Sequence, residues 1–291
     1  MKPPPFAYHA PTQLDEALVL LERYGDDAKV LAGGQSLMPL LNFRLSYPSA
    51  LIDINRVANL SYLRQENGQV RIGALTRQRT IEFSELVRRQ LPLLYEATTL
   101  VGHLPIRTRG TIGGSLAHAD PAAEYPTVAL VLDAELVLQG PSGQRSVSAE
   151  EFFVSYLTTV LAPNEVVTEI RFSPAPPTSG WAFEEVARRH GDFALVGVAG
   201  VIDTEGEQCR TVRLAAAGVG PTPIRLCAAE DILVQQGVTE QGIQHAAVKA
   251  AELVEPDSDI HASADFRQHL TQVLTRRAIQ RALERGRERR A

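Results

Sequence analysis

The chain has 291 residues, of which 44% are hydrophobic and 22% charged, and its formal net charge is −5. This length suffices for two or three domains of ordinary globular composition, and the acidic balance argues against a broad nucleic-acid-binding surface. No run of about 18 apolar residues occurs, so we expect no membrane span. The first residues, Met1 to Phe6, lack the apolar core of a signal peptide, so we expect a cytoplasmic protein.

The first 55 residues are expected to form a compact unit of strands with one crossover helix. Thr12 and Asp15 have the spacing of a capping box, and apolar residues recur with a helical period as far as Tyr24. Residues 28–32 and 50–54 are expected to be buried strands. Between these strands lies the sequence Ala-Gly-Gly-Gln-Ser, followed by a short helical turn.

Residues 56–176 are expected to form a second unit of mixed helix and strand. An Asn-Gly turn at residues 67–68 predicts a hairpin. The remaining elements expected here are helices over 80–86, 91–101 and 121–131 and strands over 135–139, 145–147 and 165–172. Residues 102–110 are polar and turn-rich, and they lead into Thr-Ile-Gly-Gly-Ser at 111–115.

A proline-rich stretch, residues 174–180, is expected to be a linker, because prolines cannot continue a helix or a central strand. The third unit, 177–291, is expected to contain strands over 183–188, 194–203 and 209–217 and helices over 223–236 and 239–254. Its tail has helical spacing from Ser263 and is rich in arginine. We expect a solvated helix face there, and a salt-bridged contact with a partner subunit is the alternative.

Two glycine pairs carry the main functional hypothesis, one within Ala32–Ser36 and one within Thr111–Ser115. Glycines without Cβ atoms allow backbone to lie against phosphate oxygens, with successive N–H groups forming a nest. One pair alone is typical of a tight turn, whereas two related pairs predict two loops that clasp one diphosphate. Neither loop contains arginine or lysine, so we expect backbone N–H groups to hold the ligand.

Other nucleotide and metal motifs are missing. The segment Gly218–Pro223 lacks the third glycine of GxGxxG and has prolines where N–H donors are needed, and no GxxxxGK[ST] loop occurs. His118 and Asp120 are expected to be polar residues beside a ligand, because no second His or Cys cluster supports a metal. Cys209 and Cys227 are 18 residues apart and have no CxxC partner. We expect free thiols, and this chain alone does not supply the four ligands of an iron–sulfur cluster.

Two further groups are candidates for ligand contact. Glu124 lies nine residues beyond Ser115, where a carboxylate would accept hydrogen bonds from ligand hydroxyls or would simply favour a helix N-terminus. The sequence His190-Gly191-Asp192-Phe193 is interpreted as a turn into a strand, which brings Phe193 near a ligand, in preference to a catalytic His/Asp pair.

The two glycine segments with their surroundings, residues 32–37 and 111–124, resemble the FAD-binding medium subunits of the molybdenum hydroxylases. This group includes carbon monoxide dehydrogenase medium chains and the flavin domain of xanthine dehydrogenase. The likeness covers essentially the whole chain. It implies an α+β fold with two FAD-binding subdomains of the PCMH-like, vanillyl-alcohol-oxidase type, over 1–55 and 56–176. A smaller C-terminal α/β domain with a three-stranded sheet and helices would follow over 177–291.

The resemblance also implies a set of cofactor contacts but no catalytic side chain and no metal ligand. Carried over by position, the FAD-binding residues would be Val30, Leu31, Ala32, Gly33, Gly34, Gln35, Ser36, Leu37, Gly102, Thr111, Gly113, Gly114, Ser115, Ala117, Glu124, Leu161 and Phe193. The chain departs from the family pattern at three places. The family often has His at position 35, a lysine where Glu184 and Glu185 stand, and Tyr at position 193. A glutamate near the flavin would disfavour a flavin anion or would point away.

The function that the resemblance implies is electron transfer within a complex. Substrate would be hydroxylated at a molybdenum cofactor on a large subunit, and electrons would pass through two [2Fe–2S] clusters on a small subunit to FAD on this chain. FAD would then reduce an external acceptor such as NAD, a quinone, oxygen or a carrier, commonly in a dimer of heterotrimers. The alternatives are a stand-alone FAD-dependent oxidoreductase and, against the intact glycine loops, a binding module that has lost FAD.

Overall fold

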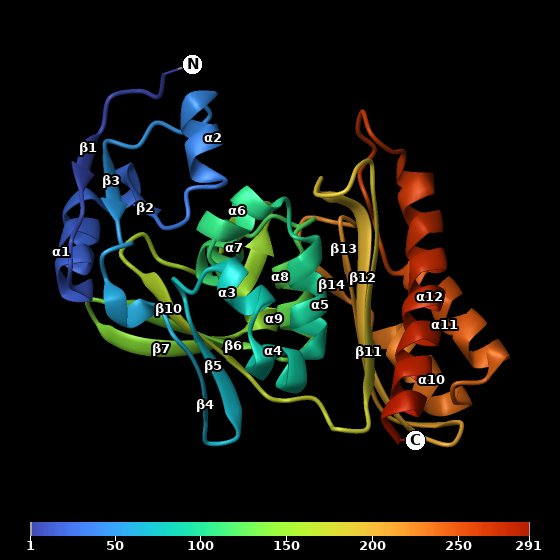
Figure 1. The fold of residues 1–291 in the computed structure, drawn as a ribbon. Helices are drawn as coiled ribbons and strands as arrows, with labels where there is room; N and C mark the ends of the chain where they lie inside the picture. The colour runs from blue at the N-terminus through green and yellow to red at the C-terminus, as the bar shows by residue number, and fades with distance from the viewer. Residues whose placement is uncertain (1, 291) are drawn as a thin grey trace.

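Three main sheets follow one another along the chain in the computed structural model, which describes residues 2–290 (Figure 1). The first is a parallel sheet in the order β1-β3-β2, formed by β1 (Ala7–His9), β2 (Ala28–Leu31) and β3 (Ala50–Asp53). Helix α1 (Leu14–Tyr24) crosses over from β1 to β2 and buries Leu18 and Leu21 against the sheet. A single turn, η1 (Gly25–Asp27), leads into β2, and α2 (Leu37–Asn42) follows the first glycine pair.

The start of α1 differs from the expected capping box of Thr12 and Asp15. The helix begins at Leu14, and Glu16 accepts hydrogen bonds from the backbone amides of Thr12 at 3.0 Å and Gln13 at 3.3 Å. The longer side chain of Glu16 reaches back to these amides, which satisfies donors that the first helical turn leaves free.

The second sheet is antiparallel, in the order β4-β5-β10-β6-β7. Its strands are β4 (Leu63–Glu66), β5 (Gln69–Gly73), β6 (Glu135–Gly140), β7 (Gly143–Ser148) and β10 (Val166–Phe172), and η2 (Ala58–Leu60) precedes them. Asn67 and Gly68 both have positive φ, at 51° and 78°. These angles are those of the two-residue hairpin turn that the Asn-Gly sequence predicts.

Several short helices lie between this second sheet and the third sheet, which is described below (Figure 1). They are α3 (Gln78–Glu82), α4 (Glu85–Gln90), α5 (Pro92–Leu100), α6 (Leu104–Arg109), α7 (Ile112–His118), α8 (Glu124–Val131) and α9 (Ala149–Phe152). A small hairpin of β8 (Phe153–Ser155) and β9 (Thr158–Thr159) follows α9.

Two expectations for this region are wrong. One helix over 80–86 is replaced by α3 and α4, because Ser84 starts a new helix by accepting a hydrogen bond from the Val87 amide at 3.2 Å. The turn-rich stretch 102–110 contains α6, where Pro105 occupies the first turn and lacks only an N–H that the helix does not need.

The third sheet is antiparallel and has the order β11-β12-β13-β14. It consists of β11 (Gly180–Ala187), β12 (Ala194–Glu205), β13 (Gln208–Ala217) and β14 (Ile224–Arg225), and α10 (Cys227–Gln236), α11 (Glu240–Glu252) and α12 (Ala264–Arg290) complete the chain. The expected three-stranded sheet therefore gains a short fourth strand. β14 pairs with Ala215 and Ala216 and delays the start of α10 to Cys227.

Both faces of this third sheet are covered. Ala199 and Val201 of β12 pack into the core of the second sheet and its helices, whereas Val198 and Ile202 pack under the C-terminal helices. Strand residues alternate between the two faces, so one sheet serves two cores. α12 lies along β11 and β12, and its buried side chains show that the tail is not a solvated helix throughout. Arg285 on α12 pairs with Glu96 on α5 at 2.5 Å, a salt bridge within the chain.

Candidate functional site

The first glycine segment lies directly against the residues that precede the second. A Cβ on Gly33 would stand 2.5 Å from the carbonyl oxygen of Arg109 and 2.8 Å from Cα of Gly110, both backbone atoms. Gly34 adopts a positive φ of 72°, which also favours glycine. The fold therefore brings together the two glycine segments that the sequence pairs only by similarity.

Side-chain amides orient the peptide groups of the first segment. Asn55 Nδ2 donates to the carbonyl of Ala32 at 2.7 Å, and Gln35 Nε2 donates to the carbonyl of Gly33 at 2.9 Å. Because a trans peptide places C=O and N–H on opposite sides, the N–H groups of Gly33 and Gly34 point away from these side chains. Within residues 2–290 the amides of Gly33 to Ser36 donate to no other group, so they form the row of free donors that the sequence predicts. The Gln35 Nε2 group uses one of its two N–H donors to shape the loop.

The second glycine pair does not form a loop, which corrects the expectation of two backbone nests. Gly113 and Gly114 lie in the first turn of α7, where Thr111 Oγ1 accepts from the Gly114 amide at 3.1 Å. The Gly113 amide donates to the carbonyl of Ala74 at 3.0 Å, and the Ser115 amide donates to that of Thr111 at 3.1 Å. These N–H groups are already bonded within the chain. Gly113 serves close packing instead, because a Cβ there would lie 2.5 Å from that of Ala74.

Gly114 and Ser115 still border the first segment. A Cβ on Gly114 would lie 2.8 Å from the Thr111 hydroxyl that caps α7 and 3.7 Å from the Cβ of Ala32, so the missing side chain leaves room both for the cap and between the segments. A positively charged side chain from outside the two glycine segments, that of Arg77, lies where the segments meet. Arg77 donates to the carbonyl of Arg109 and, at 2.7 Å, to Asn55 Oδ1. No motif in the sequence marks Asn55 or Arg77 as a site residue.

A buried carboxyl group lies at the start of α8, and a partly buried one lies on β11. Glu124 is only 6% exposed, and burial, with Glu185 and Asp120 nearby, raises the pKa of its carboxyl to about 8. Burial also raises the pKa of Glu185 to about 7, and its Oε2 has no hydrogen-bond partner among the described residues. Glu184 is different, since it pairs with Arg281 of α12. Glu184 and Glu185 stand where the family often has lysine. Glu184 points to α12, and Glu185 lies beside Glu124.

The turn between β11 and β12 contacts the segment after Gly102. Gly191 has a φ of 86°, and a Cβ there would lie 2.6 Å from Nδ1 of His103. The rings of His103 and His190 stack with centroids 6.3 Å apart. Asp192 pairs with Arg188 at 3.5 Å, so this is a turn and not a His/Asp catalytic pair.

Phe193, two residues beyond Gly191, is 58% exposed and is carried by this turn. Ala117 is exposed on α7, and β9, which leads to Leu161, packs against that helix. His118 is half-buried, and its burial lowers its pKa. No group of three or more His, Cys, Asp or Glu side chains placed to hold a metal occurs within residues 2–290.

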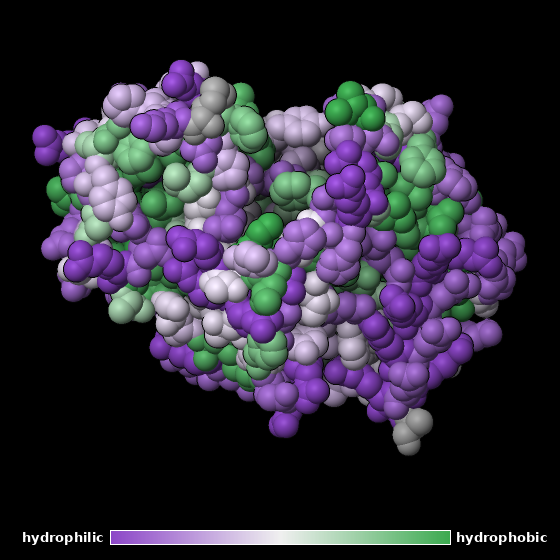
Figure 2. Space-filling view, turned by 45° about the horizontal axis from the view of Figure 1, so that its top comes forward, coloured by the Kyte–Doolittle hydropathy of each residue, from purple (hydrophilic) through white to green (hydrophobic). Residues whose placement is uncertain are grey.

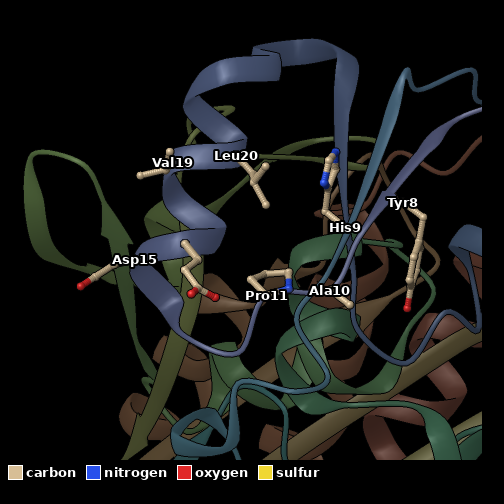
Figure 3. Close-up of a pocket in the computed structure, with 8 residues that line it drawn as sticks. Tyr8, His9, Ala10, Pro11, Asp15, Val19 and Leu20 are labelled. Carbon is tan, nitrogen blue, oxygen red and sulfur yellow. The ribbon is translucent and has the colours of Figure 1, made fainter.

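Two open pockets lie elsewhere on the surface. One of about 710 Å³ is bounded by Tyr8, His9 and Leu20 between β1 and α1 (Figure 3), and one of about 600 Å³ lies beside the 174–177 linker and Arg289. Neither is lined by the glycine segments. Figure 2, which brings the top of Figure 1 forward, shows the surface hollowed between the N-terminal region on the left and the C-terminal region on the right.

Comparison with known proteins shows which group has this arrangement. Residues 4–175 match the FAD binding domain in molybdopterin dehydrogenase, and residues 181–282 match the CO dehydrogenase flavoprotein C-terminal domain. The chain belongs to the FAD-binding medium subunits of the molybdenum hydroxylases. It is 43% identical to the 6-hydroxypseudooxynicotine dehydrogenase complex subunit alpha of Paenarthrobacter nicotinovorans, over 99% of this chain and 97% of that protein. It is 39% identical to the carbon monoxide dehydrogenase medium chain of Hydrogenophaga pseudoflava, over 97% and 98% of the two chains.

Solved structures agree with this membership. Carbon monoxide dehydrogenase from Hydrogenophaga pseudoflava, in a form that lacks the Mo-pyranopterin moiety, superposes with a TM-score of 0.96 at 40% identity, covering 98% of this chain and 99% of that one. Quinoline 2-oxidoreductase from Pseudomonas putida 86 gives 0.92 at 38% identity, with both chains fully covered. The expected family and FAD-binding fold are confirmed. The free amides of Gly33 to Ser36 and the open space beside Gly114 fit the diphosphate of FAD.

Proposed function

We propose that this chain is the FAD-binding electron-transfer subunit of a molybdenum-containing hydroxylase or dehydrogenase complex. A large molybdopterin-binding subunit would hydroxylate the substrate, and a small subunit with two [2Fe–2S] clusters would pass the electrons to this chain. The chain would then deliver them to an external acceptor, within a dimer of heterotrimers. The carrying observation is the contact of Gly33 with Arg109 and Gly110, which joins two glycine segments in a chain that matches the medium-chain family along its length.

The residues of this chain would bind and orient the cofactor, while bound FAD supplies the redox chemistry. The amides of Gly33 to Ser36 would donate to the diphosphate, and Gly114 would allow its close approach. Glu124 would bind ligand hydroxyls, and because its pKa lies near 8 it holds a proton at neutral pH. Phe193 would cover an apolar part of the ligand. No acid, base or nucleophile is assigned to this chain.

We also propose functional units at 1–55, 56–176 and 177–291 and a cytoplasmic location. Cys209 and Cys227 are both free thiols in the structure, which supports a reducing compartment. Within residues 2–290 no helix combines the length and apolar character needed to cross a bilayer.

The test is to purify the chain with the subunits that accompany it in its own cells. We expect molybdenum, iron and flavin in the complex, with flavin bands near about 370 and 450 nm that bleach when the substrate of the partner subunit is added. A matched complex with Gly33→Val should keep its iron–sulfur absorbance and lose the flavin. Reduction of flavin on the isolated chain by an organic substrate would instead identify a stand-alone oxidoreductase.

A further inference from the structure

We propose that Arg77 is a positioning residue for FAD, which acts through Asn55 to set the direction of the N–H groups in the first glycine segment. This inference rests on the proposed function, since it deepens the assignment of that segment to the cofactor diphosphate. Arg77 lies outside both glycine segments, immediately before α3, and it is half-buried where they meet.

The argument starts from the hydrogen-bonding capacity of Asn55. Its side chain has one oxygen acceptor and one NH2 donor group. A guanidinium carries donors only, so the Arg77 contact at 2.7 Å must be made to Oδ1. The NH2 group is then the one that faces the carbonyl of Ala32, at 2.7 Å, and the carboxylate of Asp53, at 2.6 Å.

This choice of amide orientation is passed on to the loop. With Nδ2 fixed, the carbonyl of Ala32 points toward Asn55, and the N–H of Gly33 points to the opposite side of the same peptide plane. If Asn55 were rotated by half a turn, its Oδ1 would face the Ala32 carbonyl and Asp53, and three acceptors would meet. Arg77 therefore favours the arrangement in which the Gly33 N–H is free for a ligand.

The second arm of the same guanidinium ties this arrangement to the other glycine segment. Arg77 donates to the carbonyl of Arg109, the oxygen on which Gly33 packs. Its backbone bridges that of Thr111, and the Gln78 amide donates to the carbonyl of Gly110 at 2.9 Å. The Arg77 side chain thus contacts both Asn55, which orients the first glycine segment, and the backbone that precedes the second segment. It also adds a positive charge beside the expected diphosphate.

Arg77, Asn55 and Asp53 form a hydrogen-bonded relay, and Asp53 is itself held in place by further hydrogen bonds. Asp53 ends β3 and accepts hydrogen bonds from the hydroxyl of Tyr8 at 2.6 Å and the amide of Asn55 at 2.9 Å. Burial raises the pKa of Asp53, but the hydrogen bonds from Tyr8 and Asn55 and the charge of Arg77 outweigh it, so that the pKa lies below its ordinary value. The ionised carboxylate can only accept, which reinforces the Nδ2 orientation of Asn55.

The experiment compares Arg77→Gln, Arg77→Lys and Asn55→Ala in the full-length chain, purified with its accompanying subunits and freed of FAD. Arg56→Gln is the matched control, since it removes the same charge from an exposed position next to Asn55. FAD affinity is measured by quenching of flavin fluorescence, and the Tm of each FAD-free variant is measured separately. A purely structural role would lower the Tm without a further loss of affinity.

We expect Arg77→Gln and Asn55→Ala each to weaken FAD binding by about 10- to 100-fold. Each variant loses the charge-assisted hydrogen bond between Arg77 and Asn55 and, with it, the orientation of the Ala32 peptide group. Their effects should not add in the double variant, because both break one relay. Arg77→Lys keeps the charge but lacks the fork, so it should recover only part of the affinity. Arg56→Gln should bind within about twofold of the wild type.

Three results would overturn the inference while leaving the proposed function intact. These are Arg77→Gln binding FAD like the wild type, full recovery in Arg77→Lys, and additive losses in the double variant. If Arg77→Gln does not fold, wild-type affinity in a folded Asn55→Ala variant has the same meaning. Failure of the wild-type complex itself to bind FAD would refute the proposed function.

Discussion

Replacing Glu124 with glutamine should stabilise the FAD-free protein, and the gain should depend on pH. Burial raises the pKa of this carboxyl from an ordinary 4.5 to about 8. The folded state therefore binds the proton more tightly than the unfolded state, so the stability present below pH 4.5 is lost as pH rises toward 8. At about 1.4 kcal/mol per pH unit, the loss reaches about 3 kcal/mol at pH 7 and less than about 1 kcal/mol at pH 5.

Glutamine has nearly the same shape and cannot ionise, so Glu124→Gln should escape this loss. We expect the variant to exceed the wild type by about 3 kcal/mol at pH 7 and to match it near pH 4.5, as measured by urea unfolding of the FAD-free chain. Glu22→Gln, at an exposed position of α1, is the control and should change little. A gain that does not grow with pH would show that Glu124 is not held neutral by burial. FAD binding adds a second readout, because Glu124→Leu removes every acceptor and should weaken it about tenfold.

Four further variants test the glycine packing at the site and the ion pairs of the fold. Gly33→Val and Gly114→Val should each abolish FAD retention, seen in the ratio of flavin to protein absorbance, while far-UV circular dichroism remains near that of the wild type. The cost for Gly33→Val should be about 1–3 kcal/mol, because its side chain meets backbone atoms, and stoichiometric flavin in both variants would contradict the assigned cradle. Arg285→Ala should lower the free energy of unfolding by about 2 kcal/mol, because it strands the mostly buried Glu96. Arg88→Ala, which breaks an exposed pair, should cost less than about 0.5 kcal/mol, and equal losses in these two arginine variants would refute the distinction.

Local sequence patterns were sufficient for most strands, for the Asn-Gly hairpin and for the proline linker. In each of these, neighbouring residues determine the backbone conformation. The pairing of the two glycine segments was also predictable, because each carries a recognisable signature. The prediction for residues 102–110 was wrong because a proline such as Pro105 is typical both of a turn and of the first turn of a helix.

The second glycine pair shows what local patterns miss. Whether the amide of Gly113 is free depends on the carbonyl of Ala74, a partner that only the folded chain supplies. Asn55 and Arg77 were missed for the same reason. Each is an ordinary polar residue in its own stretch, and the relay exists only where β3 meets the segment before α3. The burial that changes the proton affinity of Glu124 likewise comes from tertiary packing.

The third sheet, shared between two cores, limits how this protein can be taken apart. The linker at 174–180 separates the two matched families in sequence, yet Ala199 and Val201 of β12 complete the apolar interior of the region before it. A protease that cuts the linker should therefore yield two fragments that stay together as a non-covalent pair. Either fragment produced alone would expose the apolar surface that the other fragment covers in the intact protein. It would therefore aggregate or fail to accumulate. A split version of this gene should work only when both halves are made in the same cell.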